Sequence, residues 1–186
     1  MEITQRELMT IIHGMLFGGF FLMSVFGAIV TMLEPANPQA PPALLASRWK
    51  TIYLSATVVL GWAAVLSGAY IIYPWYRAVA PAGADLTLYP KLLLTSNPTT
   101  VGWHTFGMEW KEHVAWIAPM AMTMVAFVML RYPAAWNAYR QVRTAVLGFA
   151  AAAFLAAMLA GGWGAQIDKA APVRGGNTIQ LMRNAK

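Results

Sequence analysis

The sequence predicts an all-α integral membrane protein built as a bundle of four transmembrane helices. Of its 186 residues, 59% are hydrophobic and only 11% are charged, which is more apolar surface than one soluble core of this size could bury. Four apolar segments are each long enough to cross about 30 Å of hydrocarbon as a helix, at about 1.5 Å per residue. None shows the short alternating pattern of an outer-membrane strand, so helices are favoured.

The predicted transmembrane domain covers residues 1–167, and a polar tail follows at 168–186. The expected helices span about 8–33, 51–73, 108–130 and 144–167, with a long loop at 74–107. In the first helix, acidic residues stand where a signal peptide carries basic ones, and the apolar run exceeds the usual 7–15 residues, so we expect it to be retained. Pro119 is expected to kink the third helix.

The topology follows from the basic residues in the short connections. Five basic residues and one acid fall in the connections 34–50 and 131–143, namely Arg48, Lys50, Arg131, Arg140 and Arg143 with Glu34. Short basic loops stay cytoplasmic, which predicts a bacterial-type inner membrane protein with both termini and the long loop on the periplasmic side. That side holds eight basic residues and six acids, spread over more polypeptide. The net charge of +6 suits anionic lipid headgroups and needs no nucleic acid to explain it.

The absence of cysteine restricts the cofactors that the chain can hold. Disulfides, thiolate-bound zinc, cysteine-held iron–sulfur clusters and thioether-attached haem are excluded. Any cofactor must therefore be held by histidine, by methionine or by non-covalent packing.

Two histidines stand at nearly the same depth in two helices that cross the membrane in the same direction. His13 lies 21 residues before Glu34, and His113 lies 18 residues before Arg131. The difference of three residues is about 4.5 Å along a helix axis, which ordinary tilts absorb. An imidazole in a bilayer is costly and usually faces a bundle interior, a cofactor or a proton path. A haem iron near the periplasmic face could take one nitrogen from each histidine.

The neighbours of the two histidines fit a haem pocket. Small and aromatic residues surround the predicted ligands, namely Gly14, Gly18 and Phe17 in the first helix and Trp116 and Met120 in the third. Arg6 and Lys111 could pair with haem propionates at the aqueous boundary. The alternative for the glycines and aromatic residues is ordinary packing between membrane helices.

Two acids and a third histidine complete the candidate residues. Glu109 and Glu112 lie close to His113 and could accept the protons that a quinol releases on oxidation. They could equally be interfacial carboxylates balanced by Lys111. His104 falls in the long loop, where a solvated or interfacial histidine is expected rather than a metal ligand.

The segments around the two histidines carry a resemblance at the level of a class. His13 with the Gly14-x-x-x-Gly18 pair, and His113 at the end of Met108-Glu109-Trp110-Lys111-Glu112-His113, resemble the four-helix membrane subunits of b-type cytochromes in respiratory complexes. The resemblance implies one b-type haem and electron exchange with quinone inside a larger complex. Many members of that class carry four histidines for two haems, whereas this chain offers two suitable ones.

The predicted function is therefore that of a membrane electron-transfer subunit of an oxidoreductase complex, without a catalytic domain of its own. Two alternatives stand beside it: a cofactor-free structural or assembly subunit, and a pigment-binding subunit. Other subunits are expected to dock on the 74–112 loop, because Leu92, Leu93 and Leu94 form an apolar run in it. The tail is too polar to build a core, so it should become ordered only against another surface.

Overall fold

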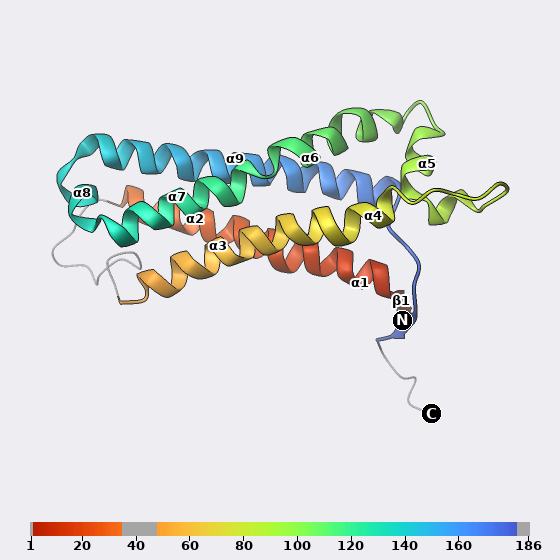
Figure 1. Ribbon diagram of the computed structural model, residues 1–186, viewed down its shortest axis with the longest axis horizontal. Helices are drawn as coiled ribbons and strands as arrows, with labels where there is room; N and C mark the ends of the chain where they lie inside the picture. The colour runs from red at the N-terminus through yellow and green to blue at the C-terminus, as the bar shows by residue number, and fades with distance from the viewer. Residues whose placement is uncertain (1, 35–47, 182–186) are drawn as a thin grey trace.

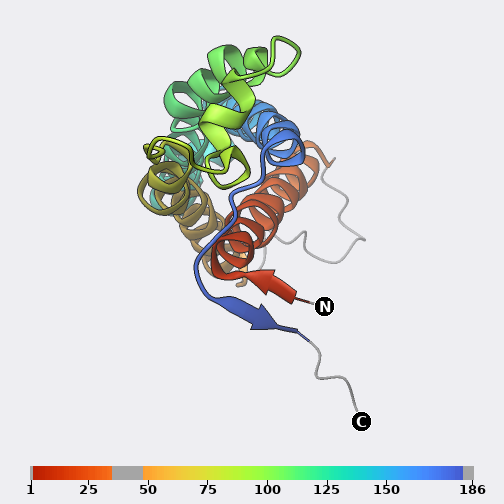
Figure 2. The same ribbon diagram turned by 90° about the vertical axis from the view of Figure 1, so that its right-hand side faces the viewer.

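The computed structural model describes residues 2–34 and 48–181. Four helical segments in it are long and apolar enough to cross a membrane: Gln5–Leu33, Lys50–Tyr76, Trp103–Arg131 and Arg140–Ala170. They lie side by side in one elongated bundle, with both ends of the chain at the same end (Figures 1 and 2). This arrangement agrees with the predicted four-helix architecture. Most of the connection 34–50 and the last residues of the tail lie outside the described residues.

Three of the four segments combine α-helix with stretches of wider π-helix. The first consists of α1 (Gln5–Ile11), η1 (Ile12–Gly19) and α2 (Phe20–Leu33); the second of α3 (Lys50–Ser67), η3 (Gly68–Ile72) and α4 (Tyr73–Tyr76); the third of η5 (Trp103–Met108), α6 (Glu109–Val114) and α7 (Ile117–Arg131). The fourth, α9 (Arg140–Ala170), is a single helix of 31 residues. Insertions of π-helix are uncommon and often occur at functional sites.

The third segment is interrupted where the sequence predicted a kink. Helix α6 ends at Val114 and α7 begins at Ile117. Pro119 has no amide hydrogen to donate to the Ala115 carbonyl, so the ladder of helical hydrogen bonds is broken there. The Ala115 carbonyl instead accepts a shorter-range bond from the Ala118 amide at 3.2 Å.

The helices extend beyond their predicted ends, and the predicted long loop is partly helical. The second segment continues to Tyr76 and the third already begins at Trp103. Between them lie a 3-10 turn, η4 (Leu86–Leu88), and a short helix, α5 (Pro90–Thr95), while α8 (Pro133–Ala138) occupies the connection before α9. The Asp85 carboxylate caps η4 by accepting from the Thr87 amide at 2.9 Å, which lowers the pKa of Asp85.

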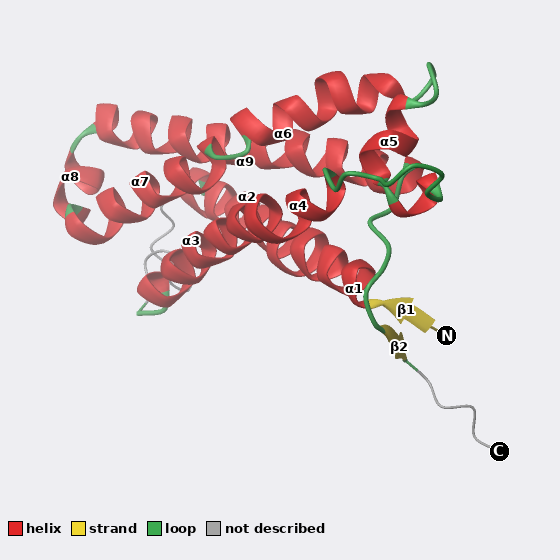
Figure 3. Cartoon of the chain, turned by 45° about the vertical axis from the view of Figure 1, so that its right-hand side comes forward, coloured by secondary structure: helices red, strands yellow, loops and turns green. Residues whose placement is uncertain are grey.

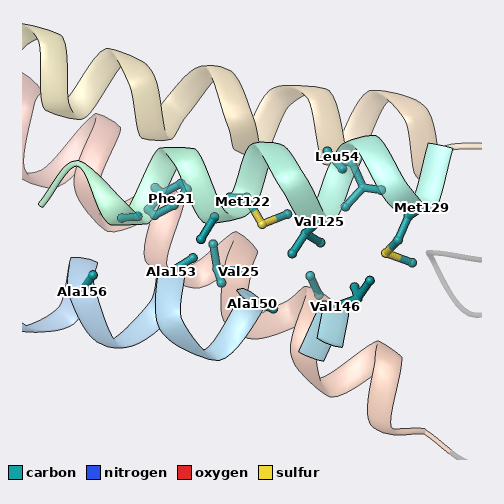
Figure 4. Packing of buried hydrophobic residues seen from close by; sticks show 14 residues of the cluster. Phe21, Val25, Leu54, Met122, Val125, Met129, Val146, Ala150, Ala153 and Ala156 are labelled. Atoms are coloured by element: carbon teal, nitrogen blue, oxygen red, sulfur yellow. The ribbon is translucent and has the colours of Figure 1, made fainter. Parts of the chain in front are cut away.

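The main core lies where α2, α3, α7 and α9 meet, as Figure 4 shows. Large apolar side chains of α2, α3 and α7 face small ones of α9: Phe21, Val25, Leu54, Met122, Val125 and Met129 against Val146, Ala150, Ala153 and Ala156. Alanines at steps of three and four residues give α9 a slim face, so the other helices approach it closely.

A second cluster of buried side chains lies at the end of the bundle that carries the termini. It joins Tyr76, Leu94, Met108, Ile167, Ala171 and Val173. Leu94 is only 1% exposed, whereas Leu92 is 36% exposed. We predicted a docking site from the apolar run of the long loop. One leucine of this run thus belongs to this chain's own core, and another lies at the surface.

The two ends of the chain form a small antiparallel sheet (Figures 2 and 3). Strand β1 (Glu2–Thr4) pairs with β2 (Thr178–Gln180), with Ile3 opposite Ile179. An ion pair of 3.2 Å between Arg174 and Glu7 supports the same contact. The tail up to Leu181 is therefore ordered against the N-terminus of the same chain, and neither strand was predicted.

Candidate functional site

His13 lies in the η1 stretch and faces the second segment. Its Nδ1 lies 3.0 Å from the Ser67 hydroxyl, and that hydroxyl donates its one hydrogen to the Ala64 carbonyl at 3.1 Å. With its hydrogen in that bond, the Ser67 oxygen accepts from Nδ1–H of His13. This assigns the tautomer in which the lone pair of the neutral imidazole is on Nε2.

Gly68 makes room for the His13 ring. A Cβ atom at residue 68 would lie 2.8 Å from Cε1 and 3.4 Å from Nε2 of His13. Because a contact of 2.8 Å is closer than real Cβ atoms show, only glycine allows the imidazole to lie against the second segment in this position. The sequence analysis did not identify Ser67 or Gly68, since nothing in a single sequence shows which side of the second helix meets His13.

The Lys111 side chain extends from α6 toward His13, and the region around these two side chains is the His13 corner. A Cβ on Gly164 would lie 2.7 Å from the Lys111 ammonium, so the amine rests against the backbone of α9. His13 and Asp168 are the charged or titratable groups that interact with it electrostatically. Within residues 2–34 and 48–181, no carboxylate lies within 4.0 Å of this ammonium. A cation in a long apolar helix without a close counter-ion is available to an anionic group.

His113 lies on another face of α6. Its side chain is 74% exposed, and its Nδ1–H donates to the Glu109 carbonyl at 2.8 Å, which leaves Nε2 free. Residues two apart on a helix point about 200° apart, so His113 faces away when Lys111 faces His13 and α9. In this arrangement the two predicted ligands have the same tautomer, but their imidazoles do not face each other.

The other predicted residues of the first helix differ in their surroundings. Gly14 borders open space, since nothing lies within 4 Å of a Cβ placed on it. Gly18 packs only on the His13 carbonyl, and Phe17 is half-buried. The Arg6 guanidinium lies 5.4 Å from the centre of the Trp75 ring and donates to the Arg174 carbonyl at 3.5 Å. Arg6 therefore helps to hold the tail.

The predicted neighbours on the third helix lie near its outer surface. Met120 is 48% exposed. The Trp116 ring meets the Trp62 ring edge-on, with centroids 6.3 Å apart, and the Trp62 Nε1–H donates to the Thr123 hydroxyl at 3.1 Å. These contacts hold α3 against the start of α7, and none of them involves His13.

A second cluster of polar side chains, which the sequence analysis did not identify, includes a hydrogen-bonded pair. The Tyr76 hydroxyl and Nδ1 of His104 are 2.9 Å apart and form a hydrogen bond, and Tyr76 is almost completely buried. His104 lies in the π-helical stretch η5, whereas the sequence analysis placed it in a loop. Glu112 interacts electrostatically with both Tyr76 and His104, and its Oε1 is buried without a hydrogen-bond partner among the described residues.

An aromatic cleft of about 260 Å³ opens between η5 and α9, lined by Thr99, Gly102, Trp103, Phe106 and Trp163. The Trp163 ring packs between Trp103 and Phe106, with centroid distances of 5.5 Å and 5.3 Å. No histidine lines this cleft. Its residues lie far apart in the sequence, so only the packing of the third segment on the fourth brings them together.

Comparison with known proteins assigns no family to this chain. No protein-family model, curated protein or solved structure matches it. Its function therefore has to be inferred from its own side chains and their surroundings.

Proposed function

We propose that this chain is a multi-pass protein of a bacterial-type inner membrane. The support is the presence of four long apolar helices whose outer surfaces carry large apolar side chains, among them Met15, Phe20, Met23, Val59, Phe127 and Phe149. Water would not tolerate so many exposed apolar groups on one small protein, whereas lipid would. The start of α3, the end of α7 and the start of α9, which carry basic residues, lie at the end opposite β1, so the termini are proposed to be periplasmic.

Single cysteines test this orientation, because the natural chain has none. Ala82→Cys lies in the long loop and Ala134→Cys in α8, and both sites are exposed. In intact spheroplasts, an impermeant maleimide is expected to label the Ala82→Cys protein at once and the Ala134→Cys protein only after lysis. The reverse pattern would invert the proposed topology.

Within that membrane protein, we propose that His13 is an axial ligand of one b-type haem. The observation that carries the proposal is the tautomer: Nδ1–H of His13 is held by Ser67, so the Nε2 lone pair is free to bind a metal. Histidines that bind metals are usually held in this way through their other nitrogen. A bound haem would accept and release one electron at a time, as an electron-transfer subunit requires.

His113 is the proposed second ligand, since its Nε2 is free as well. Because its side chain lies on another face of α6, ligation of one iron by both imidazoles requires α6 to rotate. The interruption at Ala115 and Trp116 is where such a rotation would meet the least resistance. The same rotation would turn Lys111 away from α9, so Lys111 is the proposed partner of a propionate at the outer edge of the haem, and its ammonium has no close counter-ion in the described part of the chain.

The proposal includes electron exchange with quinone inside a larger respiratory-type complex. Glu109 and Glu112 are the proposed proton acceptors, because both lie at the periplasmic end beside His113. The exposed Leu92 and the surface of the long loop are the proposed docking site for another subunit.

The visible spectrum of protein purified from its native membranes tests the haem. We expect a haem band that changes on reduction, its loss in His13→Ala, and its retention in His104→Ala, since His104 bonds to Tyr76 instead. His113→Ala tests the second ligand in the same way. A normal bis-histidine spectrum in the His13→Ala protein would refute the assignment.

A cofactor-free structural subunit is the second candidate function. It is favoured by the way in which His13 already packs on Gly68 and bonds to Ser67, as a histidine of an ordinary protein interior does. A spectrum without any band would support it, and bands of a chlorophyll-type ring would instead indicate pigment binding.

A further inference from the structure

The aromatic cleft between η5 and α9 has the shape and the chemistry of a ring-binding site. Three aromatic rings form its walls, and a glycine keeps them together: a Cβ on Gly107 would lie 3.2 Å from Cε3 of Trp163. A second glycine leaves the cleft open, since nothing lies within 4 Å of a Cβ placed on Gly102. Aromatic walls favour a flat ring, which they meet by stacking or edge-on.

The polar side of the cleft contains a hydrogen-bond acceptor for a ligand. The Thr99 hydroxyl donates its hydrogen to Oδ1 of Asn97 at 2.9 Å, and the Thr99 amide donates to the same oxygen. While its hydrogen is in that bond, the Thr99 oxygen has lone pairs with which to accept from a ligand. None of the five residues that line the cleft is ionisable, so a carboxylate or phosphate ligand would find no oppositely charged side chain in it.

We propose that this cleft binds the ring of a neutral, membrane-soluble phenol or quinol, with the ring lying against the open side of the Trp103, Phe106 and Trp163 rings and its hydroxyl donating to Thr99. A volume of about 260 Å³ is slightly below the range of pockets for drug-sized ligands, so it suits a single ring whose tail stays in lipid. The cleft lies at the start of the third apolar segment, where a proposed membrane would meet water.

The position of the cleft connects it to the His13 corner. Trp163 is next to Gly164, against which the Lys111 ammonium lies, and Lys111 interacts with His13. The cleft and the His13 corner therefore share the Trp163–Gly164 stretch of α9. The binding itself does not depend on haem; only a role of the ligand as an electron donor rests on the proposed function.

Two matched ligands and two matched variants test the binding. Duroquinol and durene share one tetramethylated ring and differ in the two hydroxyl groups. Binding of each to the purified full chain in neutral detergent can be measured by equilibrium dialysis without oxygen. We expect saturable binding of duroquinol, weakened about two- to tenfold by Phe106→Leu, which removes one aromatic wall. Phe127→Leu is the control, since Phe127 is similarly exposed but belongs to α7.

The hydroxyl contact is tested by Thr99→Val. Loss of one neutral hydrogen bond should weaken the binding of duroquinol about two- to tenfold, so that its affinity approaches that of durene. The proposal is overturned if duroquinol binding does not saturate, or if Phe127→Leu weakens it as much as Phe106→Leu. It is also overturned if durene binds as well as duroquinol to the natural chain. Because no haem signal enters the measurement, failure of the haem assignment leaves this result unaffected.

Discussion

Gly68→Ala is expected to push the His13 imidazole away from Ser67. The added methyl group would lie 2.8 Å from Cε1 of His13, next to the Nδ1 atom that bonds to Ser67. Overpacking of this kind costs about 1–3 kcal/mol, while alanine in place of a helical glycine returns about 0.5–1 kcal/mol. A net loss of stability is therefore expected, together with loss of haem from protein purified from native membranes.

Gly14→Ala is the matched control for this experiment. Gly14 follows His13 directly in the same π-helical stretch, but a Cβ there meets nothing within 4 Å. It should keep or slightly raise the thermal unfolding midpoint and leave the ratio of haem to protein unchanged. Equal effects of the two substitutions would show that helix preference, and not the His13 contact, is what Gly68 provides.

Gly61→Ala is expected to destabilise the main core. The new methyl group would lie 2.6 Å from Cε2 and 3.0 Å from Cδ2 of Phe21, a ring that is only 2% exposed. Because the ring is enclosed by the core between α2, α3, α7 and α9, it has little room to move. A loss of about 1–3 kcal/mol is expected, partly offset by the better helix preference of alanine. Reversible unfolding in mixed micelles of neutral and anionic detergent measures it.

Two further variants separate the contact from the general effect of the substitution. Gly148→Ala in α9 adds the same methyl group at an exposed position with nothing within 4 Å, so it should not destabilise. Phe21→Leu removes part of the ring that the methyl group of Gly61→Ala would strike. The double variant Gly61→Ala/Phe21→Leu should therefore lose less than the sum of the two single losses. Strict additivity would contradict the direct contact.

The apolar segments alone predicted the four long helices, whereas the exact ends needed the structure. Hydropathy falls at Tyr73, yet the backbone continues as helix past Pro74 to Tyr76, and the Arg77 amide donates to the Tyr73 carbonyl at 3.0 Å. Similarly, the third segment begins at Trp103, five residues before the predicted start at 108. Hydropathy reports which side chains lipid accepts, while a helix ends only where its backbone finds better partners.

Both candidate ligands could be predicted from single residue types, but their directions could not. Histidine is rare in long apolar helices and is conspicuous there, which is why His13 and His113 were found. Which way each imidazole points depends on the rotation of its helix, and that rotation is set by contacts such as Gly68 with His13 and Gly164 with Lys111. These contacts join residues 53 or more positions apart, because 68 − 13 = 55 and 164 − 111 = 53.

By itself, the sequence determined that this chain contains four long apolar helices and that His13 and His113 fall in two of them, because apolar length and residue type are local properties. Only the tertiary structure decided that His13 is held by Ser67, that Tyr76 meets His104 and that three aromatic rings form one cleft. It likewise decided that Thr178–Gln180 pairs with Glu2–Thr4. Each of these features depends on two distant segments meeting in one register, and the close packing of side chains selects that register.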